Sequence, residues 1–539
     1  MSTTSSPGHA PSITLSDVGL TWPDGQAALT GISGSFGVGR TGLVGSNGAG
    51  KSTLLRLIAG RLTPSTGHID IAGDIDYLPQ TLTLDVHATV ADLLGVTPKL
   101  RALRAIERGD VATEHFDVLG DDWDILARAD EALGHIGLGQ ADLDRRVSEV
   151  SGGEAMLIAI AGLRLRRAPV TLLDEPTNNL DRGACARLGD IVRSWPGTLI
   201  VVSHDTQLLE LMHDTAELHA GSLSVFGGPY SQWRAQLDQE QGAAVQAART
   251  AQQVVKTEKR QWIEADTKLA RRTRTAKTSY ENKRGSKILL NQRASDAQVS
   301  AGKLRTEMGG KVRSAQAALD TADARVRDDE HIHVDFADPN VPGGRRIAQL
   351  NGTTRSVIMQ GPERIALIGP NCVGKTTLLE SLVFGTEPEQ GRASGELFTQ
   401  RVGYLAQRLD GLDDSATVLE AVRSAAPSVP AGDVRNQLAR FLLRGAMVER
   451  PVSTLSGGER FRVALARLLF ADPPPPLLVL DEPTNNLDLP SVTQLVDALR
   501  AYRGALLVVS HDDAFLARLE LTSTLTLDAV GDLTEGAAG

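Results

Sequence analysis

The sequence is poor in cysteine and has no long hydrophobic run. Its two cysteines, Cys185 and Cys372, are too few for a disulfide framework or for a four-cysteine zinc or iron–sulfur site, and we expect reduced intracellular thiols. The longest apolar run covers seven residues, 155–161, whereas a membrane-spanning helix needs about 20. Residues 1–12 are polar, without the basic-then-apolar pattern of a signal peptide. We therefore expect a disordered N-terminus, no membrane span and a cytoplasmic location.

The chain also lacks a basic balance. Its 539 residues carry a net charge of −10, with 41% hydrophobic and 23% charged residues, which is typical of soluble globular proteins. The length corresponds to about three to four domain-sized units. An acidic total disfavours a nucleic-acid partner, unless the basic residues are gathered in one segment.

Four segments occur twice in the same order, which indicates an internal duplication. The two copies are GLVGSNGAGKST (42–53) and ALIGPNCVGKTT (366–377), SGGE (151–154 and 456–459), LLDEPTNNLD (172–181) and VLDEPTNNLD (479–488), and VVSHD (201–205 and 508–512). The repeat predicts two similar α/β domains in tandem, 13–228 and 331–539, separated by a linker at 229–330.

The first repeated segment fits the phosphate-binding pattern G-x-x-x-x-G-K-[ST] between a strand-like and a helix-like stretch. Glycines let the backbone amides wrap the phosphates, and the helix N-terminus adds a favourable dipole. The lysine would reach the β- and γ-phosphates, and the following hydroxyl would bind Mg²⁺. The candidate residues are Gly45, Asn47, Gly48, Gly50, Lys51, Ser52 and Thr53, then Gly369, Asn371, Gly374, Lys375, Thr376 and Thr377.

An Asp-Glu pair follows a short apolar strand in each copy. The Asp (Asp174, Asp481) can hold Mg²⁺ through water, and the Glu (Glu175, Glu482) can polarise the attacking water. A histidine follows another apolar run at a matched distance in each repeat, and we expect it to contact the γ-phosphate. The candidate catalytic residues are Glu175, Glu482, His204 and His511.

In combination these residues resemble the ATP-binding-cassette ATPases. The resemblance implies two P-loop cassettes that close head to tail, so that the Ser-Gly-Gly signature of one completes the ATP site of the other. One composite site would comprise Lys51, Ser52, Gln80, Asp174, Glu175 and His204 with Ser456, Gly457 and Gly458. The other would comprise Lys375, Thr376, Gln407, Asp481, Glu482 and His511 with Ser151, Gly152 and Gly153. The implied Mg²⁺ ligands are Ser52, Gln80, Asp174, Thr376, Gln407 and Asp481.

The two copies differ at several points. Cys372 stands where the first loop has Gly48, Val150 replaces the leucine expected before the first signature, and residues 155–156 differ from 460–462. The differences leave open whether both sites hydrolyse ATP.

Single aromatic residues are the candidates for contact with the adenine base. Trp22 is the candidate to stack on the base in the first cassette, although a structural tryptophan is an open alternative. The second cassette has no clear equivalent, and Phe336 is the candidate there.

The linker is rich in helix-forming residues and contains no proline between Pro229 and Pro339. It predicts two helices, 232–275 and 291–328, which form a hairpin; a 40-residue helix is about 60 Å long. The pair Gly309-Gly310 weakens the prediction of the second helix.

The basic residues of the chain gather in this linker. Residues 251–313 contain 16 Lys and Arg against 6 Asp and Glu, a net charge of +10, so the remainder is −20. Basic residues with an interleaved tyrosine suit contact with an RNA backbone, although a solvated helical face is the alternative. The candidate RNA contacts are Arg271, Arg272, Arg274, Lys277, Tyr280, Lys283, Arg284 and Lys287. Residues 288–290 would close the hairpin or contact a partner.

Two cassettes, the Glu-Pro-Thr-Asn box and a basic helical linker resemble the ABC-F group. In that group the ATP-closed form binds the ribosome, and the linker reaches toward the tRNA and the peptidyl-transferase centre. The resemblance implies a monomeric ATPase that protects the ribosome from antibiotics or relieves stalled translation, with a housekeeping translation factor left open. The first cassette has 22 extra residues within about 98–125, either a reduced form of the group's arm or an ordinary insertion, and no C-terminal extension domain is expected.

Two other functions remain as alternatives. The ATPase subunit of a transporter with separate membrane subunits would need surfaces that couple to them, but not a long basic hairpin. A DNA-maintenance ATPase would favour a much longer coiled coil or cysteine zinc sites. The sequence leaves open the antibiotic or stalled state involved, and whether the resting state is open or closed.

Overall fold

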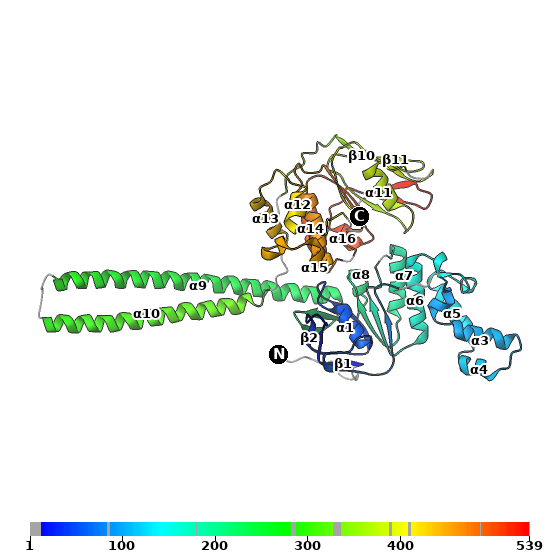
Figure 1. Ribbon diagram of the computed structural model, residues 1–539, viewed down its shortest axis with the longest axis horizontal. Helices are drawn as coiled ribbons and strands as arrows, with labels where there is room; N and C mark the ends of the chain where they lie inside the picture. The colour runs from blue at the N-terminus through cyan, green and yellow to red at the C-terminus, as the bar shows by residue number, and fades with distance from the viewer. Residues whose placement is uncertain are drawn as a thin grey trace. The chain divides into compact units, whose positions relative to one another are not determined.

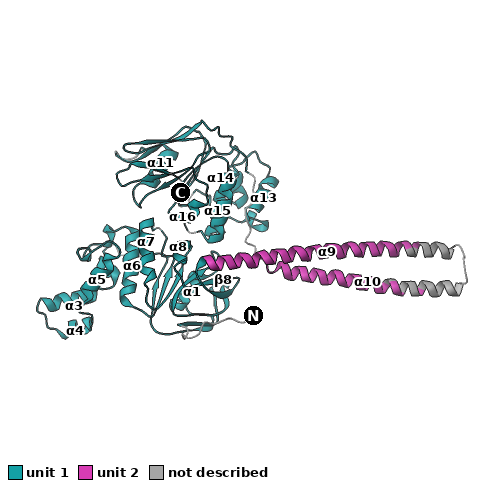
Figure 2. Cartoon of the chain, turned by 180° about the vertical axis from the view of Figure 1, so that it is seen from behind, with its two compact units in different colours: residues 1–230, 331–539 teal, residues 231–330 magenta. Residues whose placement is uncertain are grey.

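The computed structural model describes residues 12–82, 87–178, 180–281, 287–326, 336–387, 391–407, 411–485 and 487–537. By contacts it divides into one unit of residues 1–230 with 331–539 and a second unit of residues 231–330 (Figure 2). The first unit contains both cassettes, and the second is the helical linker.

The first cassette is built on a six-stranded sheet in the order β5-β6-β7-β3-β8-β9, parallel except for β9. Its strands are β3 Gly39–Val44, β5 Ile75–Leu78, β6 Val170–Asp174, β7 Thr198–Val202, β8 Asp214–His219 and β9 Ser222–Gly227. A three-stranded antiparallel sheet, β2-β1-β4, consists of β1 Ile13–Thr21, β2 Ala27–Phe36 and β4 Thr66–Ile71. Every residue of β6 and β7 is buried, as expected for central parallel strands covered on both faces.

Helices follow the strands of the first cassette and cover its parallel sheet (Figure 1). They are α1 Lys51–Ile58, α2 Val90–Leu94, α3 Thr97–Glu107, α4 Thr113–Leu119, α5 Ile125–Gly134, α6 Gly152–Arg166, α7 Arg182–Arg193 and α8 Thr206–Leu209, with short 3₁₀ turns at Gln140–Asp142 and Val147–Glu149. One core cluster joins α1 to the two sheets, and another joins α2–α7 to the other face of the parallel sheet. Helices α3 and α4 occupy the inserted segment near 98–125.

A close approach between α2 and α6 depends on Gly162. A Cβ on Gly162 would lie 2.5 Å from the Leu94 carbonyl oxygen. We expect Gly162→Ala to destabilise the first cassette by about 1–3 kcal/mol, because backbone must move to relieve the overlap. Differential scanning calorimetry should show a lower Tm. Gly134→Ala at the end of α5, where a Cβ meets nothing within 4 Å, is the matched control and should leave the Tm unchanged or raise it. Equal Tm values for the two variants would contradict the packing argument.

The second cassette repeats this architecture. Its six-stranded sheet has the order β14-β15-β16-β12-β17-β18, and a three-stranded sheet has the order β11-β10-β13. The strands are β10 Arg346–Asn351, β11 Ser356–Gln360, β12 Arg364–Ile368, β13 Ser394–Leu397, β14 Val402–Leu405, β15 Leu477–Asp481, β16 Ala505–Val509, β17 Ser523–Leu527 and β18 Leu533–Ala537. The helices are α11 Lys375–Phe384, α12 Val418–Arg423, α13 Ala431–Arg440, α14 Gly457–Leu469, α15 Leu489–Ala501 and α16 Asp513–Ala517, with 3₁₀ turns at Gly445–Glu449 and Val452–Thr454. The predicted fold class is confirmed.

The linker forms two long helices, α9 Tyr230–Glu281 and α10 Lys287–Asp323 (Figure 1). The hairpin prediction is confirmed, although α9 extends beyond the predicted end and α10 starts earlier and ends earlier. Gly309 and Gly310 do not interrupt α10. Val255 and Ala315 are buried, and Arg305 Nε contacts Asp266 Oδ1 at 2.9 Å across the hairpin. None of the helices in the described part of the chain is long and apolar enough to cross a membrane.

Candidate nucleotide sites

Each phosphate loop connects a central strand to a helix, β3 to α1 and β12 to α11. The first glycine of each loop has a left-handed backbone, with φ 152° at Gly45 and 154° at Gly369. A Cβ there would lie 2.4 Å from the Leu218 carbonyl oxygen in the first loop and 2.3 Å from that of Leu527 in the second. Only glycine therefore lets the loops turn this close to the neighbouring strands.

The loop lysines fold back over their own loops. Lys51 Nζ donates to the carbonyl oxygens of Gly45 at 2.7 Å and Ser46 at 3.1 Å, and Lys375 Nζ makes the equivalent bonds at 2.8 and 2.9 Å. Burial lowers the pKa of both ammonium groups, and nearby carboxylates, Glu175 and Glu482 foremost, oppose that shift. The lysines therefore supply buried positive charge inside the loops, where phosphate oxygens are bound in this motif.

A hydroxyl and a carboxylate meet beside each lysine. Ser52 Oγ donates to Asp174 Oδ1, and Thr376 Oγ1 donates to Asp481 Oδ2, both at 2.9 Å. Burial raises the pKa of each Asp, while the hydroxyl and the loop lysine oppose the rise. These oxygens fit Mg²⁺, which takes one or two protein ligands and completes its shell with water and phosphate. In the described residues no three acidic, His or Cys side chains form a separate metal cluster.

Each catalytic candidate Glu occupies a strained position at a strand end. Glu175 and Glu482 have φ values of 51° and 47°, which are uncommon for residues other than glycine and often mark functional sites. His204 Nε2 lies 3.2 Å from Glu175 Oε1, and His511 Nε2 lies 3.3 Å from Glu482 Oε1.

Burial determines the protonation of these groups. It raises the pKa of both Glu175 and Glu482 to about 7. Burial, and next the neighbouring lysine, lower the pKa of His204 to about 3 and of His511 to about 4. The imidazoles are therefore neutral at pH 7, and each carboxylate has a proton affinity suited to general-base chemistry near neutrality.

Two cavities combine residues of both cassettes. The first, of about 470 Å³, is lined by the first phosphate loop, Trp22, Gln80, Glu175 and His204 together with Ser456 and Gly457. The second, of about 440 Å³, is lined by the second phosphate loop, Gln407, Asp481, Glu482 and His511 together with Ser151, Gly152 and Gly153. Of the sequence candidates for the first site, Gly45, Asp174 and Gly458 do not line this cavity, although Asp174 accepts a hydrogen bond from Ser52, which does.

The cassettes also exchange hydrogen bonds at the phosphate loops. Asn47 N donates to Asp488 Oδ2 at 2.7 Å, and Asn371 N donates to Asp181 Oδ2 at 3.3 Å. Burial favours the neutral form of Asp488, but the bonds from Asn47 and Ser491 outweigh it and hold the pKa of this carboxyl below its usual range. Each phosphate loop therefore donates a hydrogen bond to the aspartate that ends the Asp-Glu segment of the other cassette. The spacing of the motifs within one cassette does not predict this pairing.

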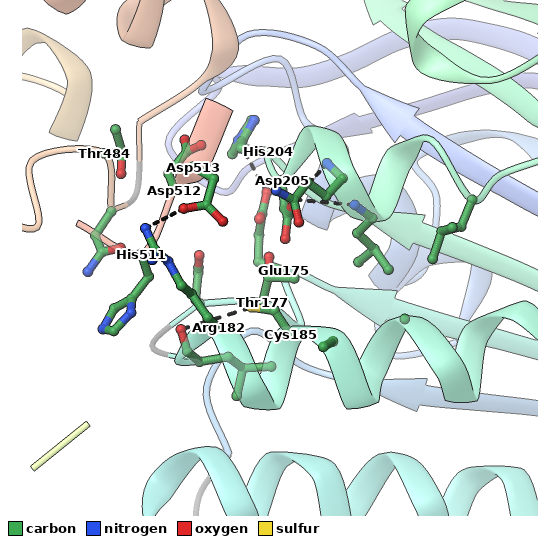
Figure 3. A pocket seen from close by; sticks show the side chains of 18 of the residues that line it. Glu175, Thr177, Arg182, Cys185, His204, Asp205, Thr484, His511, Asp512 and Asp513 are labelled. Carbon is green, nitrogen blue, oxygen red and sulfur yellow. Dashed lines mark hydrogen bonds and ion pairs between the residues drawn. The ribbon is translucent and has the colours of Figure 1, made fainter. Parts of the chain in front are cut away.

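A third cavity, of about 430 Å³, lies between the two nucleotide cavities. Figure 3 shows side chains of both cassettes around it, including Glu175 and His204 from the first and His511 from the second. An ion pair between Arg182 and Asp513 crosses it. This third cavity shares Glu175 and His204 with the first nucleotide cavity and Glu482 and His511 with the second, so it connects the two.

The structure changes the list of base-contacting candidates. Trp22 lines the first cavity. Phe336 does not line the second; its ring packs 6.1 Å from Phe441 and 5.8 Å from Phe470 in the core, so the sequence hypothesis for Phe336 is wrong. Arg392, which the sequence analysis missed, lines the second cavity. No motif marks Arg392, because it precedes β13 outside the repeated segments.

The basic linker candidates are described only in part. Arg271 and Arg274 are exposed on α9. Lys283 and Arg284 lie outside the described residues, as do the side chains of Arg272, Lys277, Tyr280, Lys287 and residues 288–290. Their role as RNA contacts stays a prediction.

Comparisons with known proteins agree with this geometry. The family model described as "ABC transporter" matches residues 29–178 and 354–485. The chain is 31% identical to the tylosin resistance ATP-binding protein TlrC of Streptomyces fradiae, covering 94% of this chain and 96% of that protein. It is 30% identical to the energy-dependent translational throttle protein EttA of Escherichia coli K12, over 94% and 90%. It is 28% identical to ABC transporter F family member 5 of Arabidopsis thaliana, over 89% and 70%.

Proposed function

The chain belongs to the ABC-F group of ATP-binding-cassette ATPases, and from this premise we propose that ATP closes its two cassettes into a form that binds the ribosome. The observation that carries the proposal is the pair of composite cavities, each with a phosphate loop from one cassette and a signature helix from the other. ATP bound there contacts both cassettes, so it favours the closed state by its extra contacts, and hydrolysis removes them.

In each site the Glu carboxylate accepts a proton from water as the water oxygen attacks the γ-phosphorus. The bond between the γ-phosphorus and the bridging oxygen breaks, and ADP and phosphate result. His204 Nε2 and His511 Nε2 lie 3.2 and 3.3 Å from the carboxylates. Each neutral imidazole has a single N–H, which we propose it donates to the γ-phosphate when ATP is bound. Lys51 and Lys375 supply the buried positive charge for the phosphates.

Mg²⁺ would be held by Ser52 with Asp174 and by Thr376 with Asp481, the oxygen pairs that lie 2.9 Å apart. Gln80 and Gln407 line the same cavities and would contact the ion or its water. When bound, the ion neutralises charge on the β- and γ-phosphates.

The partner is proposed to be ribosomal RNA with tRNA, reached by the basic end of the hairpin. The net charge of +10 over residues 251–313 suits phosphate contact. Two relatives of nearly full coverage support this: one is named for tylosin resistance and the other for a translational throttle. We propose that the protein acts as a cytoplasmic monomer and protects ribosomes from an antibiotic or relieves stalling. Susceptibility of a deletion strain to a panel of ribosome-targeting drugs separates these roles.

Ribosome binding is tested by co-sedimentation. The variant Glu175→Gln with Glu482→Gln and ATP should pellet with ribosomes, whereas the same variant without nucleotide should not. Replacing Lys277, Lys283 and Lys287 together by Gln should raise the apparent Kd about tenfold or more and reduce its salt dependence, because three phosphate contacts are lost.

The matched control replaces three exposed arginines of the cassettes, Arg61, Arg108 and Arg401, by Gln. This control removes the same charge and should leave the Kd nearly unchanged. Ribosome binding that is independent of ATP, or equal weakening by both triple variants, would contradict the proposal. Co-purification with membrane proteins in place of ribosomes would favour the transporter alternative.

A further inference from the structure

The helices that follow the two phosphate loops carry opposite charges at one position. The segments are KSTLLRLI in α1 and KTTLLESL in α11, so Arg56 and Glu380 each lie five residues after the loop lysine. Both side chains are exposed at the surface. At this helix position the two cassettes therefore differ by two charge units.

In the first site Arg56 lies four residues after Ser52 on α1, so both side chains are on the same face of the helix. The Arg56 charge acts on Tyr77, which lies on β5, and opposes the rise that burial gives the pKa of its hydroxyl. The Tyr77 hydroxyl donates to Asp174 Oδ2 at 3.3 Å, while Ser52 Oγ donates to Oδ1 at 2.9 Å. Both oxygens of Asp174 thus accept hydrogen bonds, and the guanidinium charge acts on the same carboxylate.

In the second site the corresponding charge is negative. Glu380 lies four residues after Thr376 on α11, on the same face of the helix. Its charge acts on Asp481 and on Tyr404, the counterpart of Tyr77 on β14. Thr376 Oγ1 donates to Asp481 Oδ2 at 2.9 Å, as Ser52 does to Asp174. The Tyr404 ring packs edge-on against Phe384, with ring centroids 5.7 Å apart. The hydroxyl and the carboxylate that would bind the cation are therefore alike in the two sites, whereas the charge of the residue at the Arg56 or Glu380 position is reversed.

We propose that Arg56 and Glu380 give the two nucleotide sites unequal affinities for divalent cations, with the tighter site at Thr376 and Asp481. The inference rests on the proposed binding of Mg²⁺ at these oxygens. A positive charge near Asp174 opposes the approach of a dication, and a negative charge near Asp481 favours it. Because both side chains are exposed and screened, the expected difference is on the order of three- to tenfold in Kd. Arg56 and Glu380 are positioning residues, since their charges act on the Asp carboxylates that would hold the ion.

The test measures cation binding directly. Mn²⁺ is titrated by electron paramagnetic resonance into the full chain with a non-hydrolysable ATP analogue. The wild type should show one tight and one weak site. Arg56→Glu should give two tight sites, and Glu380→Arg should give two weak ones. The conservative variants Arg56→Lys and Glu380→Asp should keep the wild-type pattern.

Controls separate these local charges from net charge and from folding. Arg61→Glu and Glu387→Arg make equal charge changes at exposed positions and should leave both Mn²⁺ affinities unchanged. Equal Mn²⁺ affinities in the wild type, or shifts as large in the controls as in the test variants, would overturn the inference while leaving the proposed cation sites intact. Absence of nucleotide-dependent Mn²⁺ binding in the folded wild type would overturn both. Circular dichroism establishes that each variant is folded.

Discussion

Replacing both catalytic carboxylates, Glu175→Gln with Glu482→Gln, should lower the ATPase rate by at least about 100-fold, the usual share of a general base. Glutamine keeps the size of the side chain and can still contact the histidine, but it cannot accept the proton of the attacking water. Each Glu is buried and its pKa is raised to about 7, so a neutral amide costs little in desolvation. The variant should therefore fold normally and retain ATP.

Two measurements check this expectation. Phosphate release reports the loss of hydrolysis, and retention of labelled ATP after gel filtration reports the closed state. The matched control is Glu131→Gln with Glu396→Gln, two exposed carboxylates of the same cassettes, which should keep the wild-type rate. If the doubly substituted catalytic variant turned over ATP at more than a tenth of the wild-type rate, neither Glu would be the base.

The repeated motifs could be predicted because their chemistry is local. The glycines, the lysine and the hydroxyl of a phosphate loop are neighbours in sequence, and the strand and helix on either side follow from apolar patterning. The same holds for Asp174 and Glu175, which end a buried strand. Each motif also occurs twice in the same order, which a chance match would not produce.

The features that could not be predicted depend on their structural surroundings and not on a local motif. Phe336 is one aromatic residue among several, and only the packing of Phe441 and Phe470 places it in the core. The bond from Asn371 N to Asp181 joins residues 190 positions apart. Gly309 and Gly310 lower the helix propensity of the segment, but α10 continues through both glycines because the residues around them are good helix formers.

A carboxylate placed on each signature helix should abolish ATP-driven closure. Gly457 and Gly152 are the first residues of α14 and α6, line the two nucleotide cavities, and have no atom within 4 Å of an added Cβ. Aspartate at a helix N-terminus suits the helix dipole, so the fold should tolerate it. Its charge would, however, face the γ-phosphate. We expect Gly457→Asp with Gly152→Asp to reduce ATP turnover about 100-fold, as expected when electrostatic stabilisation of the transition state is lost.

Combining one such change with one catalytic change determines whether the sites cross between cassettes. Gly457→Asp and Glu175→Gln lie in different cassettes but in the same composite site. The variant that carries both changes should therefore have the same ATPase rate as the single variant Glu175→Gln. Gly457→Asp with Glu482→Gln lies within one cassette but affects both composite sites, so the rate should fall to that of the doubly inactive enzyme. Gly432→Asp, in the first turn of α13 with equal space around its Cβ, is the control and should be fully active. The reverse ranking of the two combinations would contradict the crossed arrangement. It would mean that Gly457 and Glu482 belong to the same site, so that each signature helix completes the site of its own cassette.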